Sequence, residues 1–176
     1  MKLIRFYHAD MLNGEGLREV VFLSGCSHHC PGCFSPETWD PDTPLAHTWT
    51  KEDEEELFSN LKKPYISGVT FSGGDPLSEW NCIELYSLLK RIKENFPEKT
   101  IWVYTGFTWE NLLKLKHTDC LNKVFSYLCL EFIDVLCEGP YIQSMKSPSK
   151  PWVGSENQRV INVQESLTND KIVLYE

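Results

Sequence analysis

The sequence predicts an α/β fold with a largely parallel sheet, formed by a single domain over residues 1–176. Short apolar, β-branched runs alternate with helical patterns along the chain, which is typical of this class. Loops that contain glycine follow several of these runs, as expected where a strand turns into a helix. A hydrophobic content of 41% over 176 residues is ordinary for one globular domain.

The expected strands are short and rich in β-branched residues. They lie at residues 18–23, 68–72, 101–104, 133–137 and 159–163. Thr50 is expected to cap a helix that runs to about Leu61, with Asp53 in the third helical position. Further helices are expected over residues 78–96 and from near Thr108. In the helix over 78–96, apolar residues at helical spacing predict a buried face made of Cys82, Leu85, Leu88, Leu89 and Ile92.

The charge balance and the apolar runs exclude several classes of partner. A net charge of −8 argues against a broad nucleic-acid interface, which needs a basic surface. We see no apolar run long enough for a signal peptide or a membrane span. Seven cysteines without an export signal fit a reducing compartment. We therefore expect a cytoplasmic protein that binds neither nucleic acid nor a membrane.

Three cysteines lie close together on a turn rich in Pro and Gly, at Cys26, Cys30 and Cys33. Thiolates are soft ligands that suit iron–sulfur clusters, and three thiolates leave one iron of a 4Fe–4S cluster open for chemistry. Two alternatives remain: a zinc site with His28 or His29 as fourth ligand, and unrelated thiols. The other four cysteines show no metal-ligand spacing, so we expect structural thiols at Cys82, Cys120, Cys129 and Cys137.

Three expected strands end in loops that should meet at one edge of the sheet. The cysteine loop follows the first strand, Gly73-Gly74-Asp75 follows the second, and Thr105 follows the third. In parallel α/β folds, ligands bind at the carboxyl ends of the strands. The glycine pair lets the backbone approach a ligand closely or adopt positive φ, although an ordinary turn is the alternative. The pattern predicts a ligand site that joins the cysteine loop to these strand ends.

The Cys-x3-Cys-x2-Cys spacing resembles the radical S-adenosylmethionine signature. Several further segments resemble one family, that of the anaerobic ribonucleoside-triphosphate reductase-activating proteins, which are small glycyl-radical activases. The matching segments share their order with that family and are Asn13-Gly14-x-Gly16-x-Arg18, residues 22–33, Thr38-Trp39, residues 72–77, residues 101–107, residues 133–136 and Gly154-Ser155-x-Asn157-Gln158. Phe34 stands where the family usually has Tyr, and Glu15 replaces a common Pro.

The resemblance implies a short, incomplete (β/α) radical-SAM barrel and a set of site residues. Cys26, Cys30 and Cys33 would bind one 4Fe–4S cluster, with no catalytic residue beyond the cluster and cofactor. The residues implied for S-adenosylmethionine binding are Gly32, Cys33, Phe34, Gly73, Gly74, Asp75 and Thr105. The carboxylate of Asp75 is expected to accept hydrogen bonds from the ammonium of the methionine end.

The implied activity is activation of the anaerobic (class III) reductase, whose glycyl radical is generated through reductive cleavage of S-adenosylmethionine at the cluster. The implied partners are the reductase, as a complex with its dimer, and a flavodoxin-like or other one-electron donor. Phe34, Trp39 and Trp152 are candidate anchors of the docking rim. The alternatives are a radical enzyme acting on a small molecule, such as a 7-carboxy-7-deazaguanine synthase, and a zinc-binding interaction module.

Overall fold

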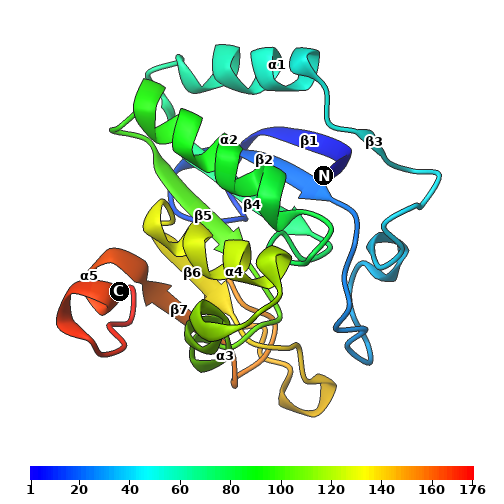
Figure 1. Cartoon of the computed structure of the whole chain (residues 1–176), viewed down its shortest axis with the longest axis vertical. Helices are drawn as coiled ribbons and strands as arrows, with labels where there is room; N and C mark the ends of the chain where they lie inside the picture. The colour runs from blue at the N-terminus through cyan, green and yellow to red at the C-terminus, as the bar shows by residue number, and fades with distance from the viewer.

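The computed structural model describes all of residues 1–176 as a seven-stranded sheet with five α-helices (Figure 1). The strands are β1 (Lys2–Asp10), β2 (Leu17–Leu23), β3 (His47–Thr48), β4 (Ile66–Gly73), β5 (Thr100–Tyr104), β6 (Val135–Glu138) and β7 (Arg159–Asn162). The helices are α1 (Lys51–Leu61), α2 (Cys82–Asn95), α3 (Trp109–Lys114), α4 (Leu121–Leu128) and α5 (Val163–Asn169). None of the helices is long and apolar enough to cross a bilayer.

The centre of the sheet is parallel and its edges are antiparallel. The strand order is β3-β1-β2-β4-β5-β6-β7, and the pairs β2–β4, β4–β5 and β5–β6 are parallel. β1 runs antiparallel to β2 and to β3, and β7 runs antiparallel to β6. The predicted α/β class is confirmed, with a mixed sheet whose strands form an open row. The short, incomplete radical-SAM barrel stays a prediction.

All five expected strands are present, and their bounds differ from the expected ones by at most two residues. The helix expected over 78–96 begins only at Cys82, because tight turns occupy the preceding residues: Ser78 N donates to Asp75 O and Asn81 N donates to Ser78 O. β1 was not expected. Its only buried residue is Leu3, so it lacks the apolar alternation that marks a strand in sequence.

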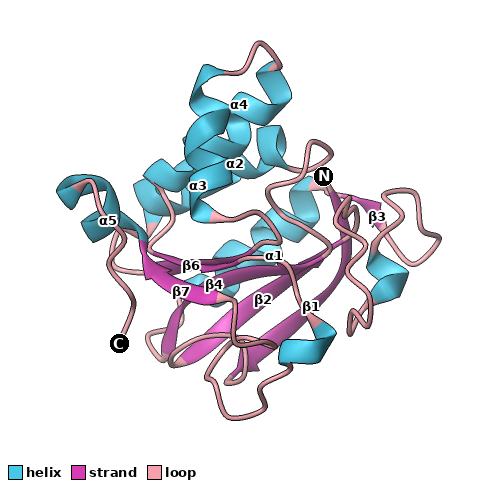
Figure 2. Cartoon of the chain, turned by 90° about the horizontal axis from the view of Figure 1, so that it is seen from below, coloured by secondary structure: helices cyan, strands magenta, loops and turns pink.

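The hydrophobic core lies between the sheet and the helices. Figure 2 shows α2, α3 and α4 on one face of the sheet, with connecting loops on the other. Val21, Phe71 and Val103 point from β2, β4 and β5 into this core. The predicted buried face of α2 is confirmed, since these side chains are fully buried: Cys82, Leu85, Leu88, Leu89 and Ile92. Burial of this face holds α2 in place, directly after the loop that follows β4.

Three aromatic rings close the opposite face of the sheet toward the amino-terminal ends of the parallel strands. We call Trp102, Trp152 and Tyr175 the aromatic plug; their ring centroids are 5.1 to 5.9 Å apart. Tyr175 N donates to Val160 O at 2.9 Å, which holds the C-terminal segment in place. The guanidinium of Arg18 lies 5.3 Å from the ring centroid of Trp102. The carboxyl-terminal half of this face remains open.

The capping box predicted at the start of α1 is confirmed. Asp53 N donates to Thr50 Oγ1 at 3.2 Å, and Thr50 N donates to Asp53 Oδ2 at 2.8 Å. Replacing Thr50 with Ala removes one half of this box, so we expect the free energy of unfolding to fall by about 1 kcal/mol. Urea denaturation of the metal-free protein measures the change. A Thr50→Ser variant keeps the hydroxyl, and a loss of equal size in both variants would contradict this account.

Candidate functional site

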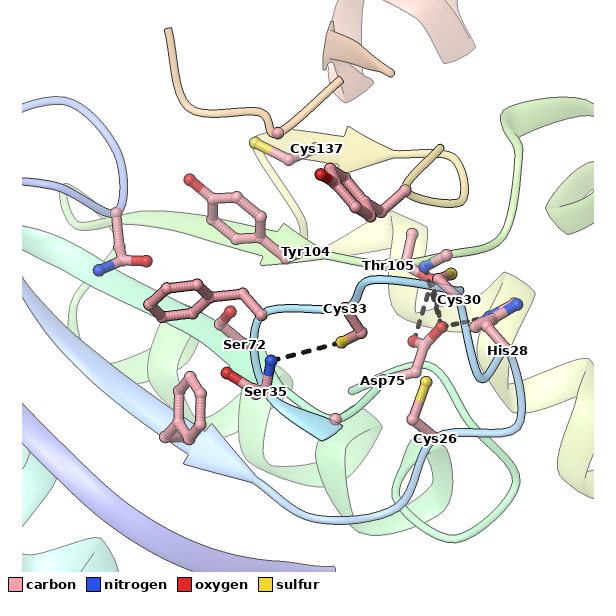
Figure 3. A pocket seen from close by; sticks show the side chains of 18 of the residues that line it. Cys26, His28, Cys30, Cys33, Ser35, Ser72, Asp75, Tyr104, Thr105 and Cys137 are labelled. Carbon is pink, nitrogen blue, oxygen red and sulfur yellow. Dashed lines mark hydrogen bonds and ion pairs between the residues drawn. The ribbon is translucent and has the colours of Figure 1, made fainter. Parts of the chain in front are cut away.

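A cavity of about 950 Å³ lies over the carboxyl ends of the parallel strands (Figure 3). Its floor includes Phe22, Ser72 and Tyr104, from β2, β4 and β5. Every residue that the sequence predicts to hold the cluster or cofactor lines it, namely Cys26, Cys30, Gly32, Cys33, Phe34, Gly73, Gly74, Asp75 and Thr105. The expected convergence of the three loops is therefore present. The roles assigned to these residues remain predictions.

Backbone hydrogen bonds fix both ends of the cysteine loop. Gly25 N donates to Thr38 O at 2.8 Å, and Cys26 N donates to Trp39 O at 3.0 Å. Gly32 has a φ of +77°, and a Cβ at this position would lie 2.3 Å from Gln143 Oε1. Glycine is required here because it adopts positive φ without strain and leaves room for Gln143. The 3₁₀ turn Gln143–Met145 thus packs directly on the loop.

The three thiols differ in their surroundings. Burial raises the pKa of Cys26 to about 11, so binding a metal there must displace a proton. The sulfur of Cys33 accepts a hydrogen bond from Ser35 N at 3.4 Å (Figure 3). No three His, Cys, Asp or Glu side chains converge on the position of a single metal ion. All three thiols line the same cavity.

Neither histidine of the loop is placed as a fourth zinc ligand. His28 Nε2 donates to Asp75 Oδ2 at 2.6 Å, and the ring of His29 packs on Trp39 with centroids 4.8 Å apart. Both side chains already have partners outside the group of thiols. The geometry therefore gives no support to the zinc alternative.

The glycine pair after β4 brings this strand end against the end of β2. Gly73 has a φ of +99°, and a Cβ there would lie 2.5 Å from Leu23 O. A Cβ on Gly74 would lie 2.7 Å from Gly25 O. Both glycines therefore allow a close approach of the chain to its own backbone, next to Cys26. The sequence predicts the positive φ correctly for Gly73, whereas close approach to a ligand remains untested.

Asp75 is the most highly connected side chain of the site. Its carboxylate is 1% exposed and accepts hydrogen bonds from Leu77 N at 2.9 Å and Gly106 N at 3.0 Å. Thr105 Oγ1 lies 2.9 Å from both carboxylate oxygens, and His28 Nε2 is the remaining donor. Asp75 thus joins the loops after β2, β4 and β5. His28 is a site residue whose role the sequence does not indicate, because its partner lies 47 residues away.

The remaining cysteines lie outside the loop, although Cys137 lines the same cavity (Figure 3). Cys82, Cys129 and Cys137 are buried, while Cys120 is exposed before α4. Burial raises the pKa of Cys137 to about 12, so this thiol stays protonated at neutral pH. Burial also raises the pKa of its neighbour Tyr104. Their positions fit the expectation of structural thiols for the three buried residues.

Two further glycine-containing segments contribute Asn13, Gly154 and Gln158 to the lining of the cavity. Gly14, with a φ of +125°, packs against Arg18 and Trp102, where a Cβ would lie within 3 Å of both side chains. Gln158 Oε1 accepts from Gly154 N at 2.9 Å, and Gln158 Nε2 donates to Gly139 O at 2.9 Å. Composition alone indicates plain loops at both places. The structure shows that the second segment forms part of the cavity wall.

The chain matches known proteins over most of its length. A family profile described as "4Fe-4S single cluster domain" matches residues 12–161. An anaerobic ribonucleoside-triphosphate reductase-activating protein of Enterobacteria phage T4 is 37% identical over 160 residues, covering 91% of this chain and 93% of its own. The protein of that name from Escherichia coli K12 is 35% identical over 162 residues, covering 91% and 97%, and that of Pasteurella multocida is 38% identical over 160 residues, covering 90% and 95%.

The chain belongs to the family of anaerobic ribonucleoside-triphosphate reductase-activating proteins. It carries the 4Fe–4S single-cluster domain, which confirms the prediction of an iron–sulfur, metal-binding protein. The region that matches the family profile includes the cysteine loop, the loop after β4, and the segment around Gln158. It ends before α5 and the segment that carries Tyr175.

Proposed function

We propose that this protein activates an anaerobic (class III) ribonucleoside-triphosphate reductase by generating its glycyl radical through reductive cleavage of S-adenosylmethionine at a 4Fe–4S cluster. One observation supports this most strongly. In a chain that belongs to the activating-protein family, the three loop cysteines and the loops after β4 and β5 line a single cavity. Relatives at 35% to 37% identity are named as activators of this reductase.

The donor set and the cavity fit the proposed groups. Cys26, Cys30 and Cys33 would hold the cluster, leaving one iron without a protein thiolate. The cavity of about 950 Å³, which Gly32, Phe34 and the loop after β4 also line, is within the size range of small-molecule and cofactor sites. When bound, the cluster and S-adenosylmethionine supply the electron and the organic radical that remove a hydrogen atom from a reductase glycine.

The protein's own residues would bind, orient and shield these groups. The fully exposed ring of Phe34 offers an apolar face for adenine at the cavity edge. Ser72 and Thr105 place hydroxyl groups at the strand ends, and Tyr104 and Phe22 form an aromatic floor that limits water. No paired acid and base is needed, because a hydrogen atom rather than a proton is transferred.

The rim of the cavity is the proposed docking site of the reductase. Phe34 and Leu12 both line the cavity and are strongly exposed, as expected for apolar anchors at an interface. Of the other rim candidates, Trp39 packs on His29, and Trp152 belongs to the aromatic plug; neither lines the cavity. Leu12 therefore replaces these two tryptophans as the second anchor. The proposal has two further parts. The protein forms a complex with the reductase dimer, and a flavodoxin-like or other one-electron donor supplies the electron.

Electron paramagnetic resonance tests the proposed function. The reconstituted protein, a chemical reductant and S-adenosylmethionine are incubated anaerobically with the class III reductase of the same host. We expect a glycyl radical with the intact reductase and none with a reductase whose C-terminal glycine is changed to alanine. 5′-Deoxyadenosine production should depend on the intact reductase in the same way.

The same assay separates the alternatives. Incubation with carboxy-tetrahydropterin in place of the reductase tests for 7-carboxy-7-deazaguanine synthase activity, and turnover of the pterin without glycyl-radical formation would refute the proposal. Analysis of anaerobically purified protein for iron, sulfide and zinc tests the interaction module. Stoichiometric zinc without sulfide would refute the cluster itself.

A further inference from the structure

His28 packs into a pocket formed by residues of the loop after β5. The residue lies between two of the loop cysteines, and its side chain is 18% exposed. Its ring packs edge-on against Phe107, with ring centroids 4.7 Å apart and an interplanar angle of 82°. A Cβ on Gly106 would lie 2.4 Å from His28 Cδ2, so the missing side chain of Gly106 makes room for the imidazole. Packing against Phe107 and Gly106 thus holds the ring in addition to its hydrogen bond.

The hydrogen bond from His28 completes the coordination of Asp75. Two carboxylate oxygens provide about four lone-pair sites. Leu77 N, Gly106 N, Thr105 Oγ1 and His28 Nε2 supply four donors. A carboxylate with all its sites filled has none left for the ammonium of a ligand. To bind an ammonium, Asp75 must first lose one of these donors.

Asp75 also holds the cysteine loop through its backbone. Asp75 N donates to Gly25 O at 2.8 Å, immediately before Cys26. The His28 bond reaches the same loop two residues after Cys26 (Figure 3). Asp75, in the loop after β4, therefore binds the cysteine loop on both sides of its first cysteine. Because Thr105 and Gly106 bind the same carboxylate, the loop is also tied to the end of β5.

We propose that His28 and Asp75 form a clamp that fixes the cysteine loop before any cofactor binds. In this view Asp75 is a positioning residue: it acts on the cluster and on S-adenosylmethionine through the loop, and it is not the acceptor of the methionine ammonium. The effect on cofactor binding rests on the proposed function, whereas the order of the loop does not. In the competing arrangement, the methionine ammonium displaces His28 and donates a hydrogen bond to Asp75 itself.

Hydrogen–deuterium exchange of the metal-free protein tests the clamp without any cofactor. In His28→Leu we expect the amides of residues 26–33 and of Gly106 to exchange about tenfold faster or more, the size expected when a hydrogen bond to a buried charge is lost. His28→Gln keeps a donor and should restore much of the protection. The matched control is His29→Gln, which changes the neighbouring histidine that makes no hydrogen bond to Asp75. Unchanged α2 amides show that each variant is folded.

Unchanged exchange in residues 26–33 of folded His28→Leu would overturn the clamp, whatever the protein's activity. The same result for His28→Leu and His29→Gln would overturn it as well. A failure of the proposed function alone leaves these amides unaffected. The two failures are therefore distinguishable.

A double-mutant cycle on the reconstituted protein distinguishes the clamp from direct ammonium binding. If the two residues act as one clamp, His28→Leu and Asp75→Asn should each lower the affinity for S-adenosylmethionine. The affinity of the double variant should then be no lower than that of the single variant with the lower affinity. The signal of the reduced cluster in electron paramagnetic resonance should change in the same way in both single variants. A cofactor affinity that falls in Asp75→Asn and is unchanged or higher in His28→Leu would overturn the clamp in favour of displacement.

Discussion

Alanine in place of Cys26, Cys30 or Cys33 is expected to remove the 4Fe–4S cluster almost completely. Each thiolate would be one of three protein ligands, and the two loop histidines already contact other residues, His28 Asp75 and His29 Trp39. Iron and sulfide per chain after anaerobic reconstitution measure the loss. Glycyl-radical formation should disappear with it.

The control for this prediction is the triple variant with alanine at Cys120, Cys129 and Cys137. These residues lie outside the cysteine loop, so the variant should bind as much iron and sulfide as the wild type. Circular dichroism checks that it remains folded, since Cys129 and Cys137 are buried in the core. A folded triple variant that loses a large share of its iron would reveal a second cluster and disprove a single site.

Arg18→Met is expected to have the largest effect on stability. Arg18 is fully buried and has no carboxylate partner; it donates to Thr70 Oγ1, Val69 O, Thr100 O and Glu15 O. Burial lowers its pKa to about 10, so the guanidinium is still charged at neutral pH. Removing these donors should lower the free energy of unfolding by about 3 kcal/mol, since each buried acceptor left without a partner costs about 1 kcal/mol or more.

Denaturation of the metal-free protein under reducing conditions measures this change. Arg18→Lys keeps the charge and part of the stem, but a single ammonium cannot reach all four groups, so we expect an intermediate loss. Equal stability of Arg18→Met and the wild type would show that the buried charge costs as much as its hydrogen bonds contribute. That outcome would contradict the prediction.

The parallel centre of the fold is predictable because its strands are buried on both faces. Val69 and Phe71 face the helices, and Thr70 between them is also buried, so β4 is a continuous run with glycines at its end. β1 gives no such signal, since its pairing with β2 rather than an apolar face holds it in the sheet. The mixed edges of the sheet were therefore not predictable from periodicity.

The residues that line the cavity were predictable for a different reason. Loops that follow parallel strands meet at one edge, so the order of the cysteines, Gly73 and Thr105 along the chain determines their proximity. The hydrogen bonds that join these loops to one another were not predictable. The bond between His28 and Asp75 spans 47 residues, and no local pattern encodes such a pair. The resemblance to a family suggested a ligand contact for Asp75, whereas the hydrogen bonds of its carboxylate reveal a connection within the protein.

The aromatic plug has a consequence for the sequence of events during turnover. It fills the face of the sheet toward the amino-terminal ends of the strands, so the cavity opens beside Phe34 and Leu12, on the rim proposed for the reductase. In the proposed reaction, cofactor and protein partner would share this entrance. S-adenosylmethionine must then enter first, and methionine and 5′-deoxyadenosine leave only after the reductase withdraws. Binding would then be compulsorily ordered, and we expect a large excess of reductase to slow the exchange of spent cofactor.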